Sequence, residues 1–353
     1  MSTDETLTIW TVQPLGFGNL NRDEDGLPKT VNILGTMRGM LSPQSLKRAA
    51  RVAYEERTNH PTYRSRELGE VIAMRAMELN PDLGEDKARK ETKKHLDKFG
   101  TDTSIWLSPD EIEAAALFVA EGGEGDLPFS RGKSASLSIA AFGRMMASAT
   151  EAGVSAAVSV SPLIASHETD FSYDFFTTVD DLAPESNKGA AFLGSSVWTS
   201  MVGVRGITIN RSQLRRSWTG IDSESAPELV GVLVRELIRQ LPKGKTNSSQ
   251  PTQRPEIVYA QIDGTPGNPA PHAVPTTEAV EYGENGYVAA TIDMLANYAK
   301  TIRAEDEADG NSADHWVAGV APESAKAKFG CDVVTTAELV DRITEWVLED
   351  VGA

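Results

Sequence analysis

The chain has 353 residues and carries 34 Lys and Arg against 51 Asp and Glu, a formal net charge of −17. This charge alone argues against a nucleic-acid-binding protein, because affinity for a phosphate backbone comes mainly from cations. The hydrophobic content of 40% is typical of a folded globular protein, and no apolar run approaches the ~20 residues that cross a bilayer. The length predicts two domains, or one large domain with an insertion.

The N-terminal part predicts one strand followed by helices. Leu7–Val12 alternates β-branched and aromatic residues in the pattern of a half-buried strand. A loop rich in Gly, Asn and Asp covers Gly16–Gly35, and Ser42-Pro43 supplies the N-cap and first position of a helix that continues through Ala53. Three more predicted helices form an inserted lobe: Glu67–Leu79, Asp86–Phe99 and Ser108–Glu121.

Beyond the glycine-rich stretch 121–125, predicted strands are mixed with helices. The strands are Ala156–Ser161, Gly203–Asn210 and Ile257–Ile262, and the helices are Ala226–Leu241, Thr291–Thr301 and Thr336–Leu348. Two segments have a disordered or low-complexity composition, namely Lys243–Gln253 and Asp306–Ser312.

Motifs for enzymatic chemistry or metal binding are not evident. The single cysteine, Cys331, excludes an internal disulfide and a thiolate metal cluster, and no two of the five histidines lie four residues apart. The segment Met1–Thr6 is polar and acidic, unlike the start of a secretory signal. We therefore expect a cytoplasmic protein without a membrane contact, a metal or a cofactor.

Basic residues are concentrated in four stretches that contain no carboxylate. These stretches hold 17 of the 34 Lys and Arg residues: Gly26–Tyr54, Leu127–Thr150, Ser186–Ile221 and Leu237–Pro255. If folding brings them together, they form a cationic groove whose phosphate contacts weaken with salt. The alternative is that the four stretches lie on unconnected surfaces.

Six short motifs occur in one order along the chain, and together they resemble the CasC family. Members of that family are the repeated backbone subunit of the type I-E Cascade surveillance complex of CRISPR immunity. The resemblance spans most of the chain. The motifs are Leu20-Asn21-Arg22-Asp23, Ser42–Ala49, Phe142-Gly143-Arg144-Met145, Phe175–Leu182, Leu193-Gly194 and Ile209-Asn210.

The resemblance implies an α+β fold with three named parts. An RRM-like palm is expected at residues 1–58 and 127–353, an inserted helical finger lobe at 59–126, and a thumb hairpin at about 168–202. The family is implied to be non-catalytic, and its copies stack along one CRISPR RNA, each thumb folding over the RNA on the next palm. The implied partners are the CRISPR RNA, target DNA through the guide, further copies of the chain, and other Cascade subunits.

The expected RNA-binding residues combine this resemblance with side-chain chemistry. Ser42 and the free N–H groups of the helix that begins at Pro43 form a candidate phosphate site. Cations along this helix and its preceding loop add charge, and Met145 is expected as an apolar wedge beside a base. The expected set is Arg22, Arg38, Ser42, Gln44, Lys47, Arg48, Arg51, Arg144, Met145, Phe176, Trp198, Arg205, Lys245, Thr246 and Asn247.

Several of these residues have a second interpretation. Lys47 and Arg48 also fit a solvated helix face, and Met145 also fits a buried core position. Phe176 and Trp198 either stack on bases or pack against a neighbouring copy.

The loop Lys243–Asn247 is either a contact to the guide backbone or a solvated loop.

Two alternative functions stay open. Asp23 lies where related type III subunits carry the aspartate that cuts RNA, so a metal-dependent ribonuclease centred on Asp23 is the enzymatic alternative. The type I-E pattern carries this aspartate without that activity, and we therefore interpret Asp23 as structural. A protein-binding scaffold without RNA is the third hypothesis.

Overall fold

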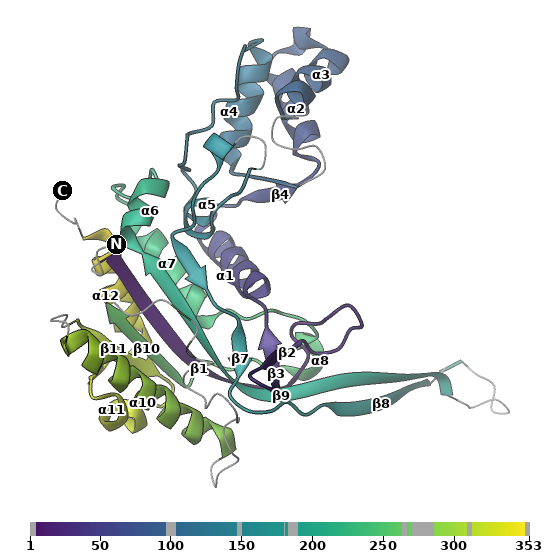
Figure 1. The fold of residues 1–353 in the computed structure, drawn as a ribbon. Coiled ribbons are helices and arrows are strands. Elements are labelled where there is room, and N and C mark those ends of the chain that lie inside the picture. The colour runs from purple at the N-terminus through teal and green to yellow at the C-terminus, as the bar shows by residue number, and fades with distance from the viewer. Residues whose placement is uncertain are drawn as a thin grey trace.

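The computed structural model describes residues 5–96, 104–146, 150–179, 181–182, 190–262, 267, 269, 286–308 and 313–349. A large mixed sheet carries helices on both faces, a helical lobe projects from it on one side, and a long β-hairpin projects on another (Figure 1). The expected mixed α+β class is therefore confirmed. In the described ranges, no helix is long and apolar enough to span a membrane.

The sheet is built around β1 (Thr6–Gly18) and β9 (Ala190–Asn210), which pair antiparallel along most of β1. The strand order is β12-β11-β10-β1-β9-β7-β3-β2, and β6 and β8 also pair with β9. The parallel pair is β11 with β12. The other body strands are β2 (Thr30–Ile33), β3 (Thr36–Leu41), β6 (Val158–Val160), β7 (Leu163–Ala165), β10 (Ile257–Ile262), β11 (His315–Gly319) and β12 (Asp332–Val333).

Both faces of the central strand β1 are buried. Successive side chains of a strand point to opposite faces, so Leu7 and Ile9 belong to one core while Trp10 and Val12 belong to another. The half-buried pattern expected for this strand was therefore wrong, because helices cover the sheet on both sides. The first layer comprises α1 (Pro43–Thr58), α7 (Ala226–Arg239) and α12 (Thr336–Leu348), and the second α10 (Gly286–Ala308) and α11 (Pro322–Phe329).

The helical lobe has a hydrophobic core of its own. Ser108 begins its last helix with a capping box, in which the Ser108 hydroxyl and the Glu111 carboxylate each accept the other residue's backbone N–H. Leu127 and Ala152, beyond the predicted insertion, also pack into this core. The lobe comprises α2 (Leu68–Leu79), η2 (Pro81–Leu83), α3 (Glu85–Leu96), α4 (Pro109–Ala120), β4 (Tyr63–Ser65) and β5 (Ile105–Leu107).

The projecting hairpin is formed by β8 (Ser172–Val179) and the first half of β9. All eight residues of β8 are exposed. Phe176 pairs with Gly194, and a Cβ at Gly194 would lie 2.5 Å from the Phe176 ring. Only glycine leaves room for the aromatic ring at this place on the hairpin.

Most predicted elements of the body are present. Ile257–Ile262 and Thr336–Leu348 match β10 and α12, whereas Thr291–Thr301 is part of the longer α10. Lys243–Gln253 contains one ordered turn of helix, and Asp306–Ser312 lies largely outside the described residues. The short helices are α5 (Leu137–Phe142), η4 (Thr150–Ala152), α6 (Arg211–Ser217) and α8 (Thr246–Ser249).

Candidate nucleic-acid interface

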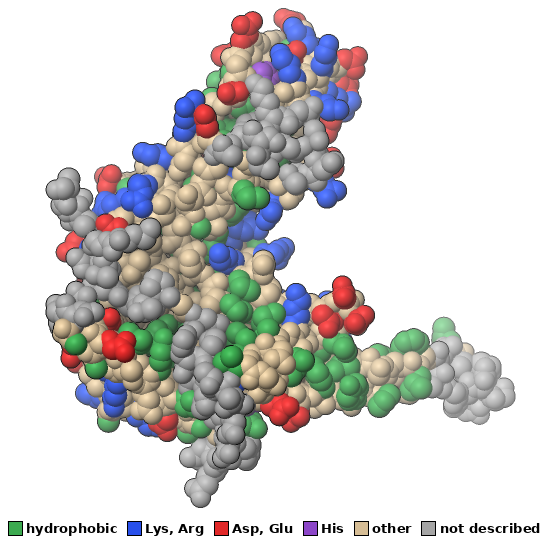
Figure 2. Space-filling model, in the orientation of Figure 1, with side chains coloured by type: hydrophobic (Ala, Val, Ile, Leu, Met, Phe, Trp, Pro, Cys, Tyr) green, Lys and Arg blue, Asp and Glu red, His purple; other side chains and the backbone are tan. Residues whose placement is uncertain are grey.

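A recess lies between α1 and the helical lobe, and we call it the basic recess. Its volume is about 650 Å³. Figure 2 shows Lys and Arg side chains gathered in the hollow beneath the projecting lobe. Six of the predicted RNA-binding residues line it, namely Gln44, Lys47, Arg48, Arg51, Arg144 and Met145.

Helical periodicity brings the cations of α1 to this recess. Leu46 and Ala50 face the core, which leaves Lys47 and Arg48 at the edge that borders the recess. Burial lowers the pKa of Lys47 from its ordinary value. Among the described residues, neither cation pairs with a carboxylate. An anion in the recess would supply the missing counter-charge.

Arg51 is held in place by the chain itself. Its Nη1 lies 3.0 Å from the Glu55 carboxylate and donates to the Thr62 hydroxyl at 3.1 Å. Its guanidinium carbon lies 5.4 Å from the ring centroid of Trp106, which belongs to the lobe strand β5. Arg51 therefore links α1 to the lobe at the edge of the recess, and only part of its charge is available to a ligand.

Arg144 and Met145 are neighbours with opposite surroundings. The Arg144 guanidinium is buried, and its Nη1 donates to both Glu111 carboxylate oxygens at 2.8 Å. Met145 is 92% exposed, so the alternative of a core methionine is wrong. Gly143 has φ +77°, and a Cβ there would lie 2.9 Å from the Ala156 nitrogen, so the turn requires glycine. Arg144 supports the wall of the recess and leaves Met145 projecting from it.

The N-terminus of α1 is tied to the loop that precedes β2. Ser42 accepts the backbone N–H of Ser45 at 3.4 Å, as predicted for the N-cap. The backbone N–H of Ser42 in turn donates to the Asn21 side-chain oxygen at 2.8 Å. Arg22, the next residue, is exposed. The structure thus holds Arg22 near the start of α1, although Arg22 is not among the residues that line the basic recess.

Two of the predicted RNA-binding arginines lie inside the body instead. Arg205 Nη2 donates to the carbonyl oxygens of Leu237 at 2.9 Å and Ile238 at 2.7 Å, and burial lowers its pKa to about 10. Arg38 is only 1% exposed, and its Nε and Nη1 have no hydrogen-bond partner. Burial also lowers the pKa of Arg38. The expectation of an RNA contact does not fit Arg205, because the core uses its donors.

Trp198 belongs to the base of the hairpin. It is 5% exposed and stacks on Phe17 with ring centroids 5.0 Å apart. Lys245 Nζ lies 5.0 Å from the Trp198 ring centroid and donates to the Ser196 hydroxyl at 3.4 Å. Base stacking on Trp198 does not fit these contacts, whereas Phe176, farther along the hairpin, is 41% exposed. Trp198 instead packs the hairpin against the loop that carries Lys245.

Thr246 and Asn247 follow Lys245 in the short helix α8. The side-chain oxygen of Thr246 is buried without a hydrogen-bond partner, and Asn247 is exposed. These residues lie by the base of the hairpin, and none of them lines the basic recess.

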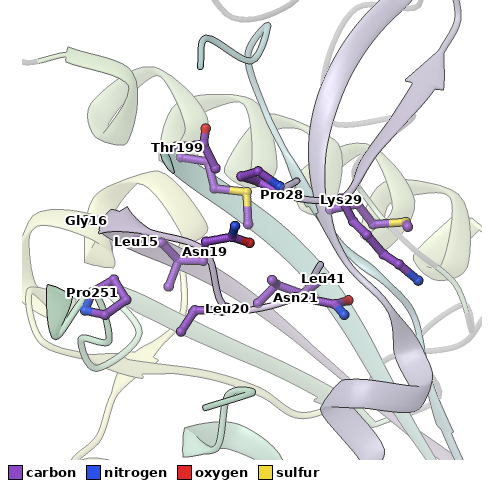
Figure 3. A pocket seen from close by; sticks show the side chains of 13 residues that line it. Leu15, Gly16, Asn19, Leu20, Asn21, Pro28, Lys29, Leu41, Thr199 and Pro251 are labelled. Atoms are coloured by element: carbon purple, nitrogen blue, oxygen red, sulfur yellow. The ribbon is translucent and has the colours of Figure 1, made fainter. Parts of the chain in front are cut away.

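A second, much smaller hollow lies at the hairpin base (Figure 3). Its volume is about 20 Å³, which is room for about one water molecule. Leu15, Leu41 and Pro251 are among its lining residues. Asn19, also at its edge, donates to the carbonyl oxygens of Gly26 at 3.0 Å and of Val197 at 3.2 Å. The hollow is a packing feature that secures the loop to β9.

Asp23 has a structural role in the loop. One of its carboxylate oxygens accepts the backbone N–H of Asp25 at 3.0 Å and that of Leu27 at 2.8 Å. Across the described ranges, no three His, Cys, Asp or Glu side chains are grouped to hold a metal ion. These contacts support the structural interpretation of Asp23.

The four acid-free stretches do not all meet. The first two form the basic recess through α1 and the residues around Met145. In the third, Arg205 and Arg211 are buried, and in the fourth, Lys245 lies by the hairpin. The lobe contributes further lining residues that lie in acid-rich segments of the sequence, outside the four acid-free stretches: Arg64, Ser104, Ile105 and Trp106.

Comparison with solved structures places this arrangement in a class. A chain of a structure described as "CRISPR RNA-guided surveillance complex, pre-nicking" is 26% identical, with a TM-score of 0.81, covering 97% of this chain and 100% of that chain. A chain of another "CRISPR RNA-guided surveillance complex" is 22% identical, with a TM-score of 0.71 and coverage of 96% and 99%, and shares the fold. The class is therefore that of mixed α+β chains found in such complexes.

The sequence profile of the CT1975-like protein family matches residues 7–346, and the chain belongs to this family. The resemblance to CasC backbone subunits is thereby confirmed. No curated protein sequence matches the chain.

Proposed function

We propose that the chain is a non-catalytic CRISPR RNA-binding backbone subunit of a surveillance complex. The observation that carries the proposal is the basic recess of about 650 Å³, which is lined by the exposed Met145 and by Lys47 and Arg48, two cations that pair with no carboxylate among the described residues. Phosphates of a single strand would neutralise the cations. The apolar side chain would contact a base without selecting its identity.

Such sequence-independent contacts suit a protein that carries a guide RNA. Base pairing between guide and target DNA supplies the sequence specificity, so the protein needs contacts that tolerate any sequence. Phosphate contacts and one apolar contact meet this requirement. Holding the guide in a fixed conformation lowers the entropic cost of pairing.

We assign the sheet body as the RRM-like palm, expected at residues 1–58 and 127–353, and the helical lobe, expected at 59–126, as the finger lobe, into whose core Leu127 and Ala152 also pack. The hairpin at about 168–202 is the thumb. The apolar exposed residues of the hairpin support a contact outside the chain, because exposed apolar patches mark interaction surfaces. They are Tyr173, Phe175, Phe176, Val179, Leu182, Phe192 and Leu193. Their partners are the guide and the next copy of the chain.

Co-purification tests the proposal. The tagged chain is purified from cells that express a CRISPR transcript, and any bound RNA is sequenced. We expect protein with strong absorbance at 260 nm and reads dominated by the processed transcript. Protein free of RNA would favour the protein-binding scaffold. Periodic cleavage of complementary RNA with a divalent metal would favour the ribonuclease.

A further inference from the structure

A second group of basic side chains lies at the C-terminal end of α7, apart from the basic recess. Arg239 and Arg254 line a hollow of about 360 Å³ whose walls include Val258 and Val320. None of its lining residues also lines the basic recess. We call this hollow the arginine pocket.

The arginines at this pocket are not neutralised within the described part of the chain. Burial, and then the charges of Arg254, Arg235 and Arg57, lower the pKa of Arg239. The nearby carboxylate of Glu236 is already used, because one oxygen lies 2.8 Å from Arg57 Nε and the other accepts from the Gln240 amide at 2.6 Å.

Among the described residues, Arg239 and Arg254 repel each other and form no ion pair with a carboxylate, although the chain carries 51 Asp and Glu residues. Mutual repulsion makes such a group unfavourable unless an anionic partner binds it.

The loop before β2 offers a matching acidic tip. Glu24 and Asp25 are exposed and form no ion pair among the described residues, and the two backbone hydrogen bonds to the Asp23 carboxylate hold the turn in shape. Figure 2 shows acidic side chains clustered on a protruding loop beside the hollow beneath the lobe.

The position of this tip favours a protein partner. Asn21 bonds the loop to Ser42 at the start of α1, so the negative tip belongs to a loop anchored to the helix whose Lys47 and Arg48 would bind RNA. Left unneutralised, it would repel the strand. A basic pocket on another copy would remove this repulsion when the copies assemble.

We propose that the arginine pocket of one copy binds the acidic tip, Glu24 and Asp25, of the next copy. This inference rests on the proposed function, because it assumes stacking of copies along a guide. A head-to-tail stack needs two different complementary surfaces on one chain, which the pocket and the tip provide. The contact would neutralise the tip and fix the order of copies on the RNA.

Charge reversal on both sides tests the contact. One variant carries R239E and R254E, and the other carries E24R and D25R. Sedimentation measures assembly on a single-stranded RNA that accommodates several copies. A separate assay measures the binding of one copy to a short RNA. Each variant alone should need about tenfold more protein for half-maximal assembly, with unchanged thermal melting. An equimolar mixture should assemble like the unmodified chain, because every contact then joins opposite charges.

Three outcomes overturn the proposal. If each variant alone assembled at the same protein concentration as the unmodified chain, the proposed contact would be refuted. Failure of the mixture to regain assembly would show that the pocket does not bind this tip. Loss of binding to the short RNA by the R239E/R254E variant would indicate that the arginine pocket binds RNA. Failure of the unmodified chain to bind either RNA would contradict the proposed function itself.

Discussion

The guanidinium of Arg144 lies 2.8 Å from both carboxylate oxygens of Glu111, and this pair joins the sheet body to the helical lobe. Arg144 Nη1 also donates to the Trp106 carbonyl at 3.1 Å. Because Met145 follows directly, the ion pair fixes the point from which the exposed methionine projects. The wall of the basic recess thus depends on a contact between segments 33 residues apart.

Removing the Glu111 carboxylate should destabilise the protein strongly. The substitution Glu111→Gln leaves the Arg144 guanidinium buried without its counter-charge, a loss of about 3–5 kcal/mol. Chemical denaturation measures the free energy of unfolding. The matched control is Glu151→Gln, which breaks the exposed pair with Arg131 and should cost less than about 1 kcal/mol. Equal effects of the two substitutions would contradict the role of the buried pair.

Replacing Lys47 and Arg48 together by alanine should weaken RNA binding and make it less sensitive to salt. Two lost phosphate contacts reduce the slope of log affinity against log salt by about 1.4. Filter binding at several salt concentrations measures the slope.

The matched control removes two exposed cations of α10 and α11, with Lys300→Ala and Lys326→Ala. It should leave the slope unchanged. An equal slope in both double variants would exclude α1 from the RNA site. His272, which we expect to be irrelevant to RNA binding, lies outside the described residues.

Substituting Met145 should separate binding from stability. Since its side chain is 92% exposed, Met145→Gln should change the free energy of unfolding by less than about 0.5 kcal/mol. Losing an apolar contact to a base should weaken RNA binding about tenfold, and Met145→Leu should retain most of the affinity. Binding isotherms measure the RNA affinity of both variants, and melting curves measure their stability. A lowered melting temperature with unchanged affinity would make Met145 a structural residue.

The protein should become less stable in mild acid, because the buried side chain of His167 resists protonation in the folded state. Its Nε2 accepts the Val202 backbone N–H at 3.1 Å, and its ring stacks on Tyr287. Burial lowers the pKa of His167 from its ordinary value of 6.5. Below this pH the unfolded chain binds a proton that the folded chain does not, so stability is lost as the pH falls from about 6.5 toward the folded-state pKa.

The variant His167→Gln retains an acceptor and should show a smaller loss between pH 7.5 and 5.5. The exposed His60→Gln is the control. Urea midpoints at the two pH values measure the difference, and parallel curves for the His167 variant and the unmodified chain would contradict it.

Replacing Arg38 with methionine should stabilise the protein. Its guanidinium is buried with two nitrogens unpaired, and an apolar side chain of similar length avoids this desolvation, a gain of about 1–3 kcal/mol. Thermal melting checks the gain. A stability loss accompanied by loss of RNA binding would instead support the expected RNA contact of Arg38.

The sequence predicted those parts of the fold in which local signals agree with tertiary packing. Ser42-Pro43 begins α1 and Ser108 begins α4, because a capping side chain acts within one turn of helix. The strand β8 carried no comparable local signal. It is exposed along its length, so the alternation of buried and exposed residues that marks a strand is missing.

Charge and helical spacing in the sequence indicated Lys47 and Arg48, which the fold places at the candidate site. It was not predictable where burial decides the role of a side chain. Arg144 and Arg205 are basic in the sequence, yet the fold satisfies them with Glu111 and with helix carbonyl groups. Trp106 enters the recess only because the lobe folds back toward α1, a contact that no local pattern specifies.

Ultraviolet cross-linking of bound RNA, followed by mass spectrometry of the linked peptides, tests the central claim most directly. We predict cross-links in the peptides that contain residues 43–51 and 142–146, on the two sides of the basic recess. Cross-links confined to α10 and α11, on the opposite face of the sheet, would contradict the account.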